Sequence, residues 1–421
     1  MRSVLPPARL EVRRGPLLLS GVDDGPSLAA HRARFGPLPT PDLAHLVDLV
    51  ESAAVRGRGG AGFPLARKLR TVARGRGRLP SRRPVVVVNA AEGEPVSAKD
   101  EALVSVAPHL VLDGAEVAAR ALGARDVHVV TSADRPLVGR AVAQALAERR
   151  GDGLRWSTHE AEGRFVAGQA RAVLELMDGR PGLPVTAWSP EAVDGHRGRP
   201  TLLSNAESWA HLGALVHVGG AAYARLGTPD EPGTMLLTVT RPPGPDGRIA
   251  LAGVVEVEHG SRARDVLDAD ALAAPLLVGG FHGTWVHPSA LRDLAWSQPH
   301  LRSLGASLGA GALVSLADGS CPVGHTAAWT EFLAVESAGR CGPCRNGLPA
   351  LARATDGLAR RVDTRPRIRE LTGLVTGRGA CAHPDGTARL VGSMLTALPD
   401  HVEDHLTGAC RCGVRVPAVV A

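Results

Sequence analysis

The sequence predicts an α/β domain, followed by a β-grasp-sized unit and a helical bundle towards the C-terminal end. Three observations support this order. Residues 84–89 form a continuous valine-rich run, strand and helix patterns alternate from there to residue 217, and residues 320–405 are almost entirely helical in pattern. A chain of 421 residues is too long for one ordinary core, so several domains are expected.

Composition excludes several classes of protein. The net charge is +6, and the basic excess consists of scattered arginines without the clustered stripe that nucleic-acid binding favours. No apolar run is long enough for a membrane span, and the first residues lack the apolar core of a signal peptide. The six cysteines gather towards the C-terminal end, which indicates metal binding in a reducing compartment. We therefore expect a cytoplasmic protein.

The chain begins with a stretch that carries little pattern. Residues 1–40 are rich in proline, arginine and glycine and predict only an N-terminal arm. The α/β domain is expected over residues 41–228. Its first element is a helix through residues 42–50, for which Thr40 is the predicted N-cap.

A glycine-rich loop over residues 57–63 follows this helix and leads into a second helix at 65–72. Its letters satisfy the GxGxxG pattern, but a dinucleotide fingerprint needs a strand before it, and here a helix precedes. Backbone N–H groups without side chains can approach a phosphate at a helix N-terminus. The alternative is a merely flexible glycine turn.

The valine-rich run at residues 84–89 is read as a buried parallel strand. Asn89, Glu92 and Glu94 lie at or just past its carboxyl end, with Lys99 and Asp100 shortly after. Open α/β sheets bind ligands at this edge. The remaining predicted elements of the domain are a strand at 126–131 and helices at 110–122, 137–149, 170–178 and 206–217.

The pattern changes after residue 228. Alternating strands at 234–240 and 248–256, a short helix at 262–267 and a strand at 276–279 predict a β-grasp domain over residues 229–290. Residues 291–319 are expected to be a linker. The helical bundle then occupies residues 320–405, and residues 406–421 form a tail that contains Cys410 and Cys412.

Three cysteines of the bundle have the spacing of a metal centre. Cys341 and Cys344 stand three apart on a Gly/Pro turn, and Cys381 follows about forty residues later. Thiolates on such a turn point into the same hollow, so an iron–sulfur cluster and a structural zinc are both possible. The zinc alternative would take His383 as its fourth ligand.

Lysine occurs only at Lys68 and Lys99, although the chain has 48 basic residues of these two types. Both lysines lie close to the glycine-rich or acidic motifs. We therefore predict that these two positions need the compact ammonium group of lysine, which the planar guanidinium of arginine does not replace. The alternative is that the two lysines have been retained by chance.

Five motifs in collinear order carry a resemblance to a known family. They are Arg-Gly-Arg-Gly-Gly-Ala-Gly-Phe-Pro, Asn-Ala-x-Glu-x-Glu-Pro with Lys-Asp, Gly-Arg-Pro-Thr with Asn-x-Glu, the β-grasp insert, and Glu-Ser with Cys-x-x-Cys-Arg and Cys-Ala. From about residue 41 to 405 the chain resembles the flavin-carrying NADH-binding subunit of respiratory complex I. Related modules occur in NAD-linked hydrogenases and formate dehydrogenases. The resemblance implies an FMN-binding α/β sheet, an SLBB-like β-grasp domain and an iron–sulfur helical bundle.

The same resemblance implies a set of cofactors and residues. FMN, NAD(H) and an iron–sulfur cluster of the 4Fe-4S type are expected, with a ferredoxin or a partner iron–sulfur subunit exchanging single electrons. Glu94 would contact the nicotinamide nucleotide, and Lys68 would reach a phosphate. The implied flavin and nucleotide ligands are Gly57, Arg58, Gly59, Gly60, Ala61, Gly62, Phe63, Lys68, Asn89, Glu92, Glu94, Gly168, Ser204 and Asn205; the implied metal ligands are Cys341, Cys344 and Cys381.

The cluster motif departs from the family pattern at one ligand. The family's first cysteine is Ala338 here, which leaves three thiols for the cluster. Ser337, His383 or a tail cysteine are candidates for the fourth position, and a three-iron or open-iron cluster is the alternative. A tail cysteine, Cys410 or Cys412, is the preferred candidate, with free surface thiols as the competing interpretation. Cys321 is expected to be a packed thiol.

The flavin and nucleotide pockets depart as well. Ala91, Gln169 and Ala170 replace acidic residues of the family, and Thr71 and Val185 stand where aromatic residues would stack on adenine. Each lost stacking partner is worth on the order of 1–3 kcal/mol. These changes predict weakened NADH binding with FMN binding retained. They also motivate an alternative, a scaffold or electron-relay subunit without NADH turnover.

Overall fold

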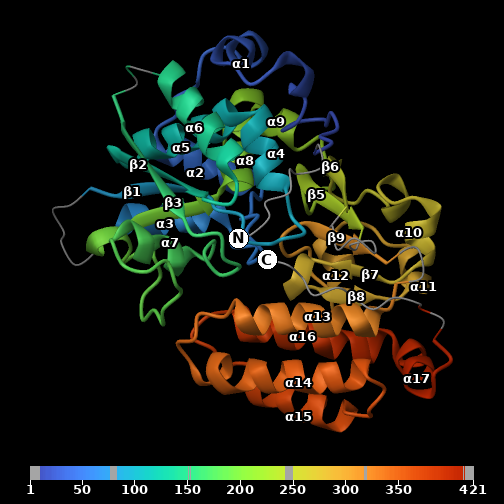
Figure 1. Cartoon of the computed structure of the whole chain (residues 1–421). Coiled ribbons are helices and arrows are strands. Elements are labelled where there is room, and N and C mark those ends of the chain that lie inside the picture. The colour runs from blue at the N-terminus through green and yellow to red at the C-terminus, as the bar shows by residue number, and fades with distance from the viewer. Residues whose placement is uncertain are drawn as a thin grey trace.

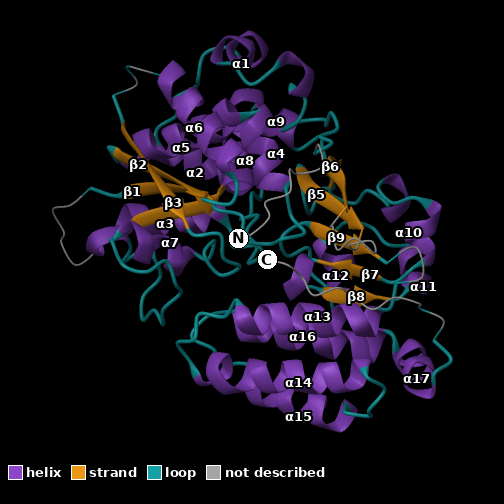
Figure 2. Cartoon of the chain, in the orientation of Figure 1, coloured by secondary structure: helices purple, strands orange, loops and turns teal. Residues whose placement is uncertain are grey.

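The computed structural model describes residues 10–75, 83–149, 151, 153–241, 250–316, 320–410 and 412, and it has three parts (Figure 1). An α/β domain contains a parallel sheet between helices. A second sheet lies beside this domain, and a bundle of helices packs below the second sheet (Figure 2). The order of the parts along the chain agrees with the predicted fold class.

The first sheet has four parallel strands in the order β3-β2-β1-β4. Its central strand β1 (Val85–Ala90) is buried at all six positions, which confirms the prediction of a buried parallel strand. β2 (Asp126–Ser132) is also confirmed. β3 (Arg155–Ala161) and β4 (Thr201–Asn205) were not predicted, because β3 is a largely polar edge strand and β4 is short.

Helices cover both faces of this sheet (Figure 1). The predicted helices are confirmed as α2, α3, α5, α6, α7 and α8. The N-cap prediction fails at α2, where the side chain of Asp42 rather than Thr40 accepts the backbone N–H of His45. The helices are α2 (Leu43–Ser52), α3 (Leu65–Arg74), α4 (Lys99–Val106), α5 (Pro108–Leu122), α6 (Pro136–Glu148), α7 (Ala170–Met177), α8 (Ala206–Val218) and α9 (Gly220–Tyr223).

Glycines let α5 and α8 approach closely in the core of the α/β domain. A Cβ atom on Gly114 would lie 1.9 Å from the carbonyl oxygen of Trp209. A Cβ atom on Gly213 would lie 2.3 Å from the carbonyl oxygen of Leu110. Both distances are far below van der Waals contact, so the crossing requires glycine at both positions.

The N-terminal arm is an ordered part of the core from residue 10. Its helix α1 (Leu28–Phe35) is fixed by His31, whose Nε2 lies 2.7 Å from Asp113 Oδ2 on α5. Farther upstream, the buried carboxylate of Glu256 accepts the backbone N–H groups of Leu17, Leu18 and Leu19 at 3.1, 2.8 and 2.9 Å. The arm therefore connects the α/β domain with the second sheet.

The second sheet has the strand order β6-β5-β9-β7-β8. Its strands are β5 (Thr234–Arg241), β6 (Ala250–Glu258), β7 (Leu276–Val278), β8 (Thr284–Val286) and β9 (Ala312–Ser315). β9 occupies the centre of the sheet although it lies in the stretch expected to be a linker, so the unit extends beyond residue 290. The predicted helix at 262–267 is only a 3-10 turn, Ala263–Asp265. Short helices α10 (Ala269–Ala273), α11 (Pro288–Leu291) and α12 (Gln298–Ser303) complete the unit.

The C-terminal bundle contains five helices in the described part of the chain. They are α13 (Pro322–Val335), α14 (Leu348–Ala359), α15 (Arg365–Val375), α16 (His383–Ala397) and α17 (Pro399–Thr407), with a π-helical turn at Pro343–Gly347. An aromatic stack joins the bundle to the second sheet, since Trp329 of α13 stacks on Phe281 and Trp285 at ring-centroid distances of 4.9 and 5.8 Å.

In the described residues, no single helix has the length and apolar character to cross a membrane. Taken together, α4 and α5 do have this length and apolar character, but the two helices meet at a bend of 92°.

Candidate redox site

The glycine-rich loop connects α2 to α3, as the sequence predicts. The loop closes on itself, because Gly57 N donates to Phe63 O at 2.9 Å. Gly60 and Gly62 have φ angles of +94° and +60°, so these two positions favour glycine. The loop rests on the N-terminus of α8, where Arg58 N donates to Ser208 Oγ at 2.8 Å.

Ser204 and Asn205 stand at the carboxyl end of β4, directly under the loop. A Cβ atom on Gly59 would lie 4.0 Å from the side chain of Asn205. Asn205 also caps α8, since its Oδ1 accepts the backbone N–H of Ser208 at 3.3 Å. The loop, the strand end and the helix N-terminus thus meet. The N–H groups of Glu207 and Ser208 at the start of α8 are already bonded to Asp100 and Asn205, so the loop amides from Gly59 onward are the candidates for binding an anion.

Both cationic side chains assigned to this pocket have partners within the protein. Arg58 Nη2 donates to Thr234 O at 2.9 Å and contacts His259 Nε2 at 2.8 Å, which joins the loop to the second sheet. Lys68 Nζ donates to Leu203 O at 2.6 Å and pairs with Glu191 at 3.1 Å. Lys68 therefore lies beside Ser204 at the end of β4. The residues fit a phosphate that is held chiefly by backbone amides.

The carboxyl end of β1 carries the other predicted flavin ligands. Asn89 Nδ2 donates to Gly168 O at 2.7 Å, and Asn89 Oδ1 accepts the backbone N–H of Ala91 at 3.2 Å. The carboxylate of Glu92 accepts Glu101 N at 3.3 Å and lies 3.7 Å from Arg135. Asn89 and Glu92 are both buried at this edge of the sheet.

Glu94 points towards the second sheet. Its Oε2 accepts the backbone N–H of Phe281 at 2.9 Å. Burial raises the pKa of Glu94 from its ordinary value of 4.5 to about 8. The carboxyl group is therefore protonated near neutral pH. The implied contact of Glu94 with a nicotinamide nucleotide stays a prediction.

Sequence reasoning did not assign a role to a buried ion-pair network beside this edge. Lys99 Nζ lies 2.8 Å from Asp100 Oδ1 and 2.9 Å from Glu207 Oε2. Glu207 Oε1 also accepts the backbone N–H of Leu236 on β5 at 3.0 Å. The Lys-Asp and Asn-x-Glu motifs were the available signal, and in the structure their residues join α4, α8 and the second sheet.

A cavity of about 160 Å³ opens on the side of the loop that faces the second sheet. Its lining includes Arg58, Gly60, Glu207, His259 and Gly309. A separate open hollow of about 540 Å³ lies along α3 and includes Thr71 and Val193.

Phe63 is the aromatic residue that remains in the glycine loop. Its side chain is 43% exposed, and the guanidinium carbon of Arg67 lies 5.6 Å from its ring centroid. The nearby hollow along α3 is lined mainly by arginines rather than by aromatic rings. A nucleotide in this hollow would therefore meet the side chains of Arg67, Arg70 and Arg74.

The CxxC turn brings two of the predicted metal ligands together. Cys341 Sγ and Cys344 Sγ lie 3.3 Å apart; Cys341 precedes the π-helical turn and Cys344 lies within it. Burial raises the pKa of Cys344 to about 11. The pKa of Cys341 is lowered, because the backbone N–H groups of Ala380 and Cys344 outweigh the effect of burial. Cys381 lies close enough to influence the pKa of Cys344. These three soft donors fit an iron–sulfur cluster with three cysteine ligands.

His383 and Ser337 are two of the candidates for the fourth ligand of the cluster. His383 Nε2 contacts Leu333 O at 2.7 Å and His383 Nδ1 contacts His282 Nε2 at 3.0 Å, so both ring nitrogens have partners. The Cys3His zinc shell that includes His383 is therefore not assembled. Ser337 lies in the same loop as the CxxC turn and stays a candidate.

The expectation that a tail cysteine completes this cluster is wrong. Cys410 and Cys412 lie with Cys321 and His401, and these form a separate group. Cys321 precedes α13 and the CxxC turn follows it, so the 14 residues of this helix separate the two cysteine groups by about 20 Å. Figure 1 shows α17 at the opposite end of the bundle from the turn that joins α13 to α14. Cys321 is buried as expected, but it has polar neighbours.

One segment connects the predicted flavin edge with the cysteines. Asn89 holds Gly168, and the side-chain amide of the next residue, Gln169, donates to the sulfur of Cys381. At the other end of the segment, Phe165 N donates to Glu336 Oε2 at 3.0 Å. Residues 164–169, the bridging segment, therefore bring the end of β1 next to the cluster ligands.

The fold and the site together define a flavin- and iron–sulfur-binding redox subunit. Two family models match the chain: the Nuo51 FMN-binding domain over residues 50–214 and the NADH-ubiquinone oxidoreductase-F iron-sulfur binding region over residues 324–405. The chain belongs to the family of these NADH-binding oxidoreductase subunits, as a divergent member.

Individual relatives agree with this assignment. The chain is 28% identical over 383 residues to the F-type subunit of the NADH-quinone oxidoreductase of Streptomyces coelicolor, covering 86% of this chain and 83% of the relative. It is 27% identical over 386 residues to the HndC subunit of the NADP-reducing hydrogenase of Solidesulfovibrio fructosivorans, covering 86% and 76%. A chain of the air-oxidized NAD+-reducing [NiFe]-hydrogenase has a TM-score of 0.78 and 26% identity, covering 95% of this chain and 68% of that one.

Proposed function

We propose that this protein moves electrons between a nicotinamide nucleotide and a partner iron–sulfur protein through FMN and an iron–sulfur cluster. The family and the residues at the two sites support this activity. FMN, when bound, supplies the step from a hydride, which is an electron pair, to single electrons. The protein itself positions the cofactors, places charged and polar groups beside them and excludes water from their sites.

The observation that carries the proposal is the contact path between the two cofactor sites. Asn89 at the end of β1 contacts Gly168, and Gln169 contacts Cys381. Consecutive Cα atoms are about 3.8 Å apart, so a single peptide separates the residue at the flavin edge from the residue at the cluster. This short connection suits electron transfer between the two groups.

The residues have distinct tasks in this function. The glycine-rich loop at 57–63 would hold the flavin phosphate with backbone amides. Asn89 and Glu92 would orient the ring system at the end of β1. Cys341, Cys344 and Cys381 would hold the cluster, and the amide of Gln169 would stabilise its charge by donating to a sulfur.

We place the protein in the cytoplasm, with a ferredoxin or an iron–sulfur subunit of a larger complex as its partner. All six cysteines are free thiols, as is typical of a reducing compartment. The curated relatives are subunits by name, which supports assembly with further subunits.

An anaerobic titration tests the proposal. The full chain is purified without oxygen, its iron and flavin contents are measured, and NADH and NADPH are added in turn while the flavin absorbance is followed. Bleaching of the flavin by either nucleotide is the expected result. A protein without flavin and iron would contradict the proposal.

The second candidate function is an electron-relay or scaffold subunit without nucleotide turnover. Arg67 over the ring of Phe63, together with the arginine-lined hollow along α3, favours this candidate because no second aromatic ring completes an adenine sandwich among the described residues there. In the same titration, a flavin that resists both nucleotides but is reduced by dithionite would select it.

A further inference from the structure

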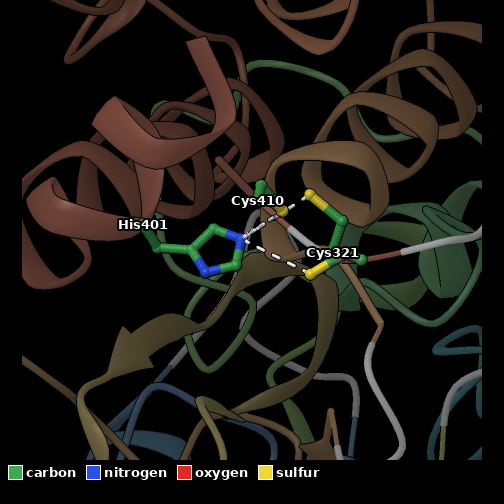
Figure 3. A group of neighbouring side chains, drawn as sticks. Cys321, His401 and Cys410 are labelled. Carbon is green, nitrogen blue, oxygen red and sulfur yellow. Dashed lines mark hydrogen bonds between the residues drawn. The ribbon is translucent and has the colours of Figure 1, made fainter. Parts of the chain in front are cut away.

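A second group of metal-binding side chains lies at the far end of the bundle. Its members are Cys321, His401, Cys410 and Cys412, and one donor atom of each lies within 4.8 Å of all the others. Figure 3 shows the ring of His401 directed at the sulfurs of Cys321 and Cys410. We infer that these four residues form a mononuclear, tetrahedral Cys3His site for Zn²⁺.

The distances match those of a tetrahedral zinc site. With Zn–S bonds of about 2.3 Å and Zn–N bonds of about 2.05 Å, a ligand sulfur and a ligand nitrogen lie about 3.6 Å apart. The sulfurs of Cys321, Cys410 and Cys412 lie 3.7, 3.6 and 3.9 Å from His401 Nε2. Two of these thiols also have other polar neighbours, since Cys412 Sγ lies 3.6 Å from Ser320 O and Cys321 Sγ lies 3.4 Å from His405 Nδ1. All three sulfurs nevertheless converge on one ring nitrogen, as the ligands of a single metal ion do.

The number and kind of the donors argue for one metal ion. Four donor atoms from four residues lie within 4.8 Å of one another, which is a complete tetrahedral set. The donor set of three thiols and one imidazole is a common shell of structural zinc.

The chain is folded locally to present these ligands. Cys321 is the N-cap residue of α13, and the backbone N–H groups of Val323 and Gly324 act against the rise that burial causes in the pKa of its thiol. Such N–H groups stabilise a metal-bound thiolate. Gly408 ends α17 with a φ of 84°, which turns the chain back, and Cys410 N donates to Asp404 O at 2.9 Å. The turn returns the tail to His401.

A further histidine supports the site from outside. His405 Nε2 lies 3.0 Å from Ala359 O, so this nitrogen carries a proton and donates it to the carbonyl. Its Nδ1 lies 3.4 Å from Cys321 Sγ. His405 therefore contacts both Cys321 and α14.

The site would fasten the tail to the start of α13. Residues 321 and 410–412 are far apart in sequence, and a shared zinc ion closes the loop between them. The site also explains the two cysteines of the tail, which the redox cluster does not use. It stands independently of the redox function, since none of its residues belongs to the flavin pocket or the CxxC turn.

Metal analysis of matched variants tests the inference. The full chain, the Cys410→Ser/Cys412→Ser double variant and the Cys341→Ser/Cys344→Ser double variant are purified anaerobically from a medium with zinc and iron. The intact protein is expected to hold about one zinc per chain in addition to cluster iron. The tail variant should lose zinc and keep iron, whereas the CxxC variant should lose iron and keep zinc.

A second measurement covers the case in which the tail variant folds poorly. The protein is loaded with Co²⁺ in place of zinc, and the visible bands of tetrahedral cobalt with thiolate ligands are recorded for the intact chain and for Cys412→His. Both proteins should show these bands, with a shift in the variant that has one sulfur fewer. Zinc-free intact protein, iron lost from the tail variant alone, or a disulfide among Cys321, Cys410 and Cys412 detected by intact mass would overturn the inference.

Discussion

The side-chain amide of Gln169 donates a hydrogen bond to the sulfur of Cys381. Burial raises the pKa of this thiol, and the amide acts against that effect. The family resemblance predicts an acidic residue at this position. The amide that stands there instead acts on a cluster ligand.

We predict that Gln169→Glu lowers the midpoint potential of the cluster. The variant replaces a donor by a negative charge beside the thiolates, and a hydrogen bond to a charged group is worth about 1.5 kcal/mol, or on the order of 60 mV for one electron. A redox titration followed by electron paramagnetic resonance measures the shift. Gln144→Glu on the exposed face of α6 is the control with the same change in charge. An equal shift in both variants would rule out a local effect.

We predict that the stability of the protein carries a pH dependence from Glu94. Its pKa is raised from 4.5 to about 8 in the folded chain, so between these values the unfolded chain ionises while the folded chain keeps the proton. Unfolding then releases a proton, and stability falls as pH rises through this window. The whole window is worth about 5 kcal/mol, at about 1.4 kcal/mol per pH unit.

Glu94→Gln should remove this dependence, because its amide has the shape of the protonated carboxyl and cannot ionise. Urea unfolding between pH 5 and 8 should show that the variant gains stability relative to the parent as pH rises. Glu331→Gln on the exposed face of α13 is the control. A difference between Glu94→Gln and the parent that stays constant with pH would contradict the assignment.

We predict that Gly168→Ala disrupts the bridging segment. A Cβ atom at this position would lie 2.3 Å from the carbonyl oxygen of Ala91, so the end of β1 must move. The expected loss is about 1–3 kcal/mol of unfolding free energy, with a fall in bound flavin. Thermal unfolding and flavin content measure both effects. Gly392→Ala in α16 has open space around the new methyl group and should stabilise the helix by up to about 1 kcal/mol.

We predict opposite outcomes for two residues of the cluster region. Cys344→Ser should lose cluster iron, since its sulfur is one of the three donors at the CxxC turn. His383→Gln should keep iron, because both nitrogens of that ring are bound to Leu333 and His282. Iron content and flavin absorbance are measured for each. Iron lost from His383→Gln, in a variant that remains folded, would make His383 a ligand after all.

The sequence predicts the elements whose residues carry a strong local pattern. The valine run at β1 and the long amphipathic helices have the expected places, because burial and periodicity determine them locally. β9 was missed because Ala312–Ser315 is short, and its place at the sheet centre depends on strands far away in sequence. The resemblance supplied the candidate ligands, and contacts in space decided which cysteines lie together.

The partners of charged residues could not be predicted from the sequence. The sequence predicts a role for the ammonium groups of Lys68 and Lys99 but does not identify their partners. In the structure each ammonium lies in a buried or half-buried ion pair with a carboxylate. The contact of Glu94 with the backbone N–H of Phe281, in another part of the chain, gave no signal in the sequence. Nothing in the sequence indicates His401 as a metal ligand, because its closeness to Cys321 depends on how the fold brings α17 beside the start of α13.

The contact between Glu256 and the three leucine N–H groups bears on how this protein can be shortened. A version that begins at residue 41 keeps every family motif, yet it leaves a buried carboxylate without three of its donors. The hydroxyl of Thr234 remains as a donor to this carboxylate, but the shortened chain loses the contact between the arm and the second sheet and should be less stable. The folding unit therefore begins upstream of the first family motif.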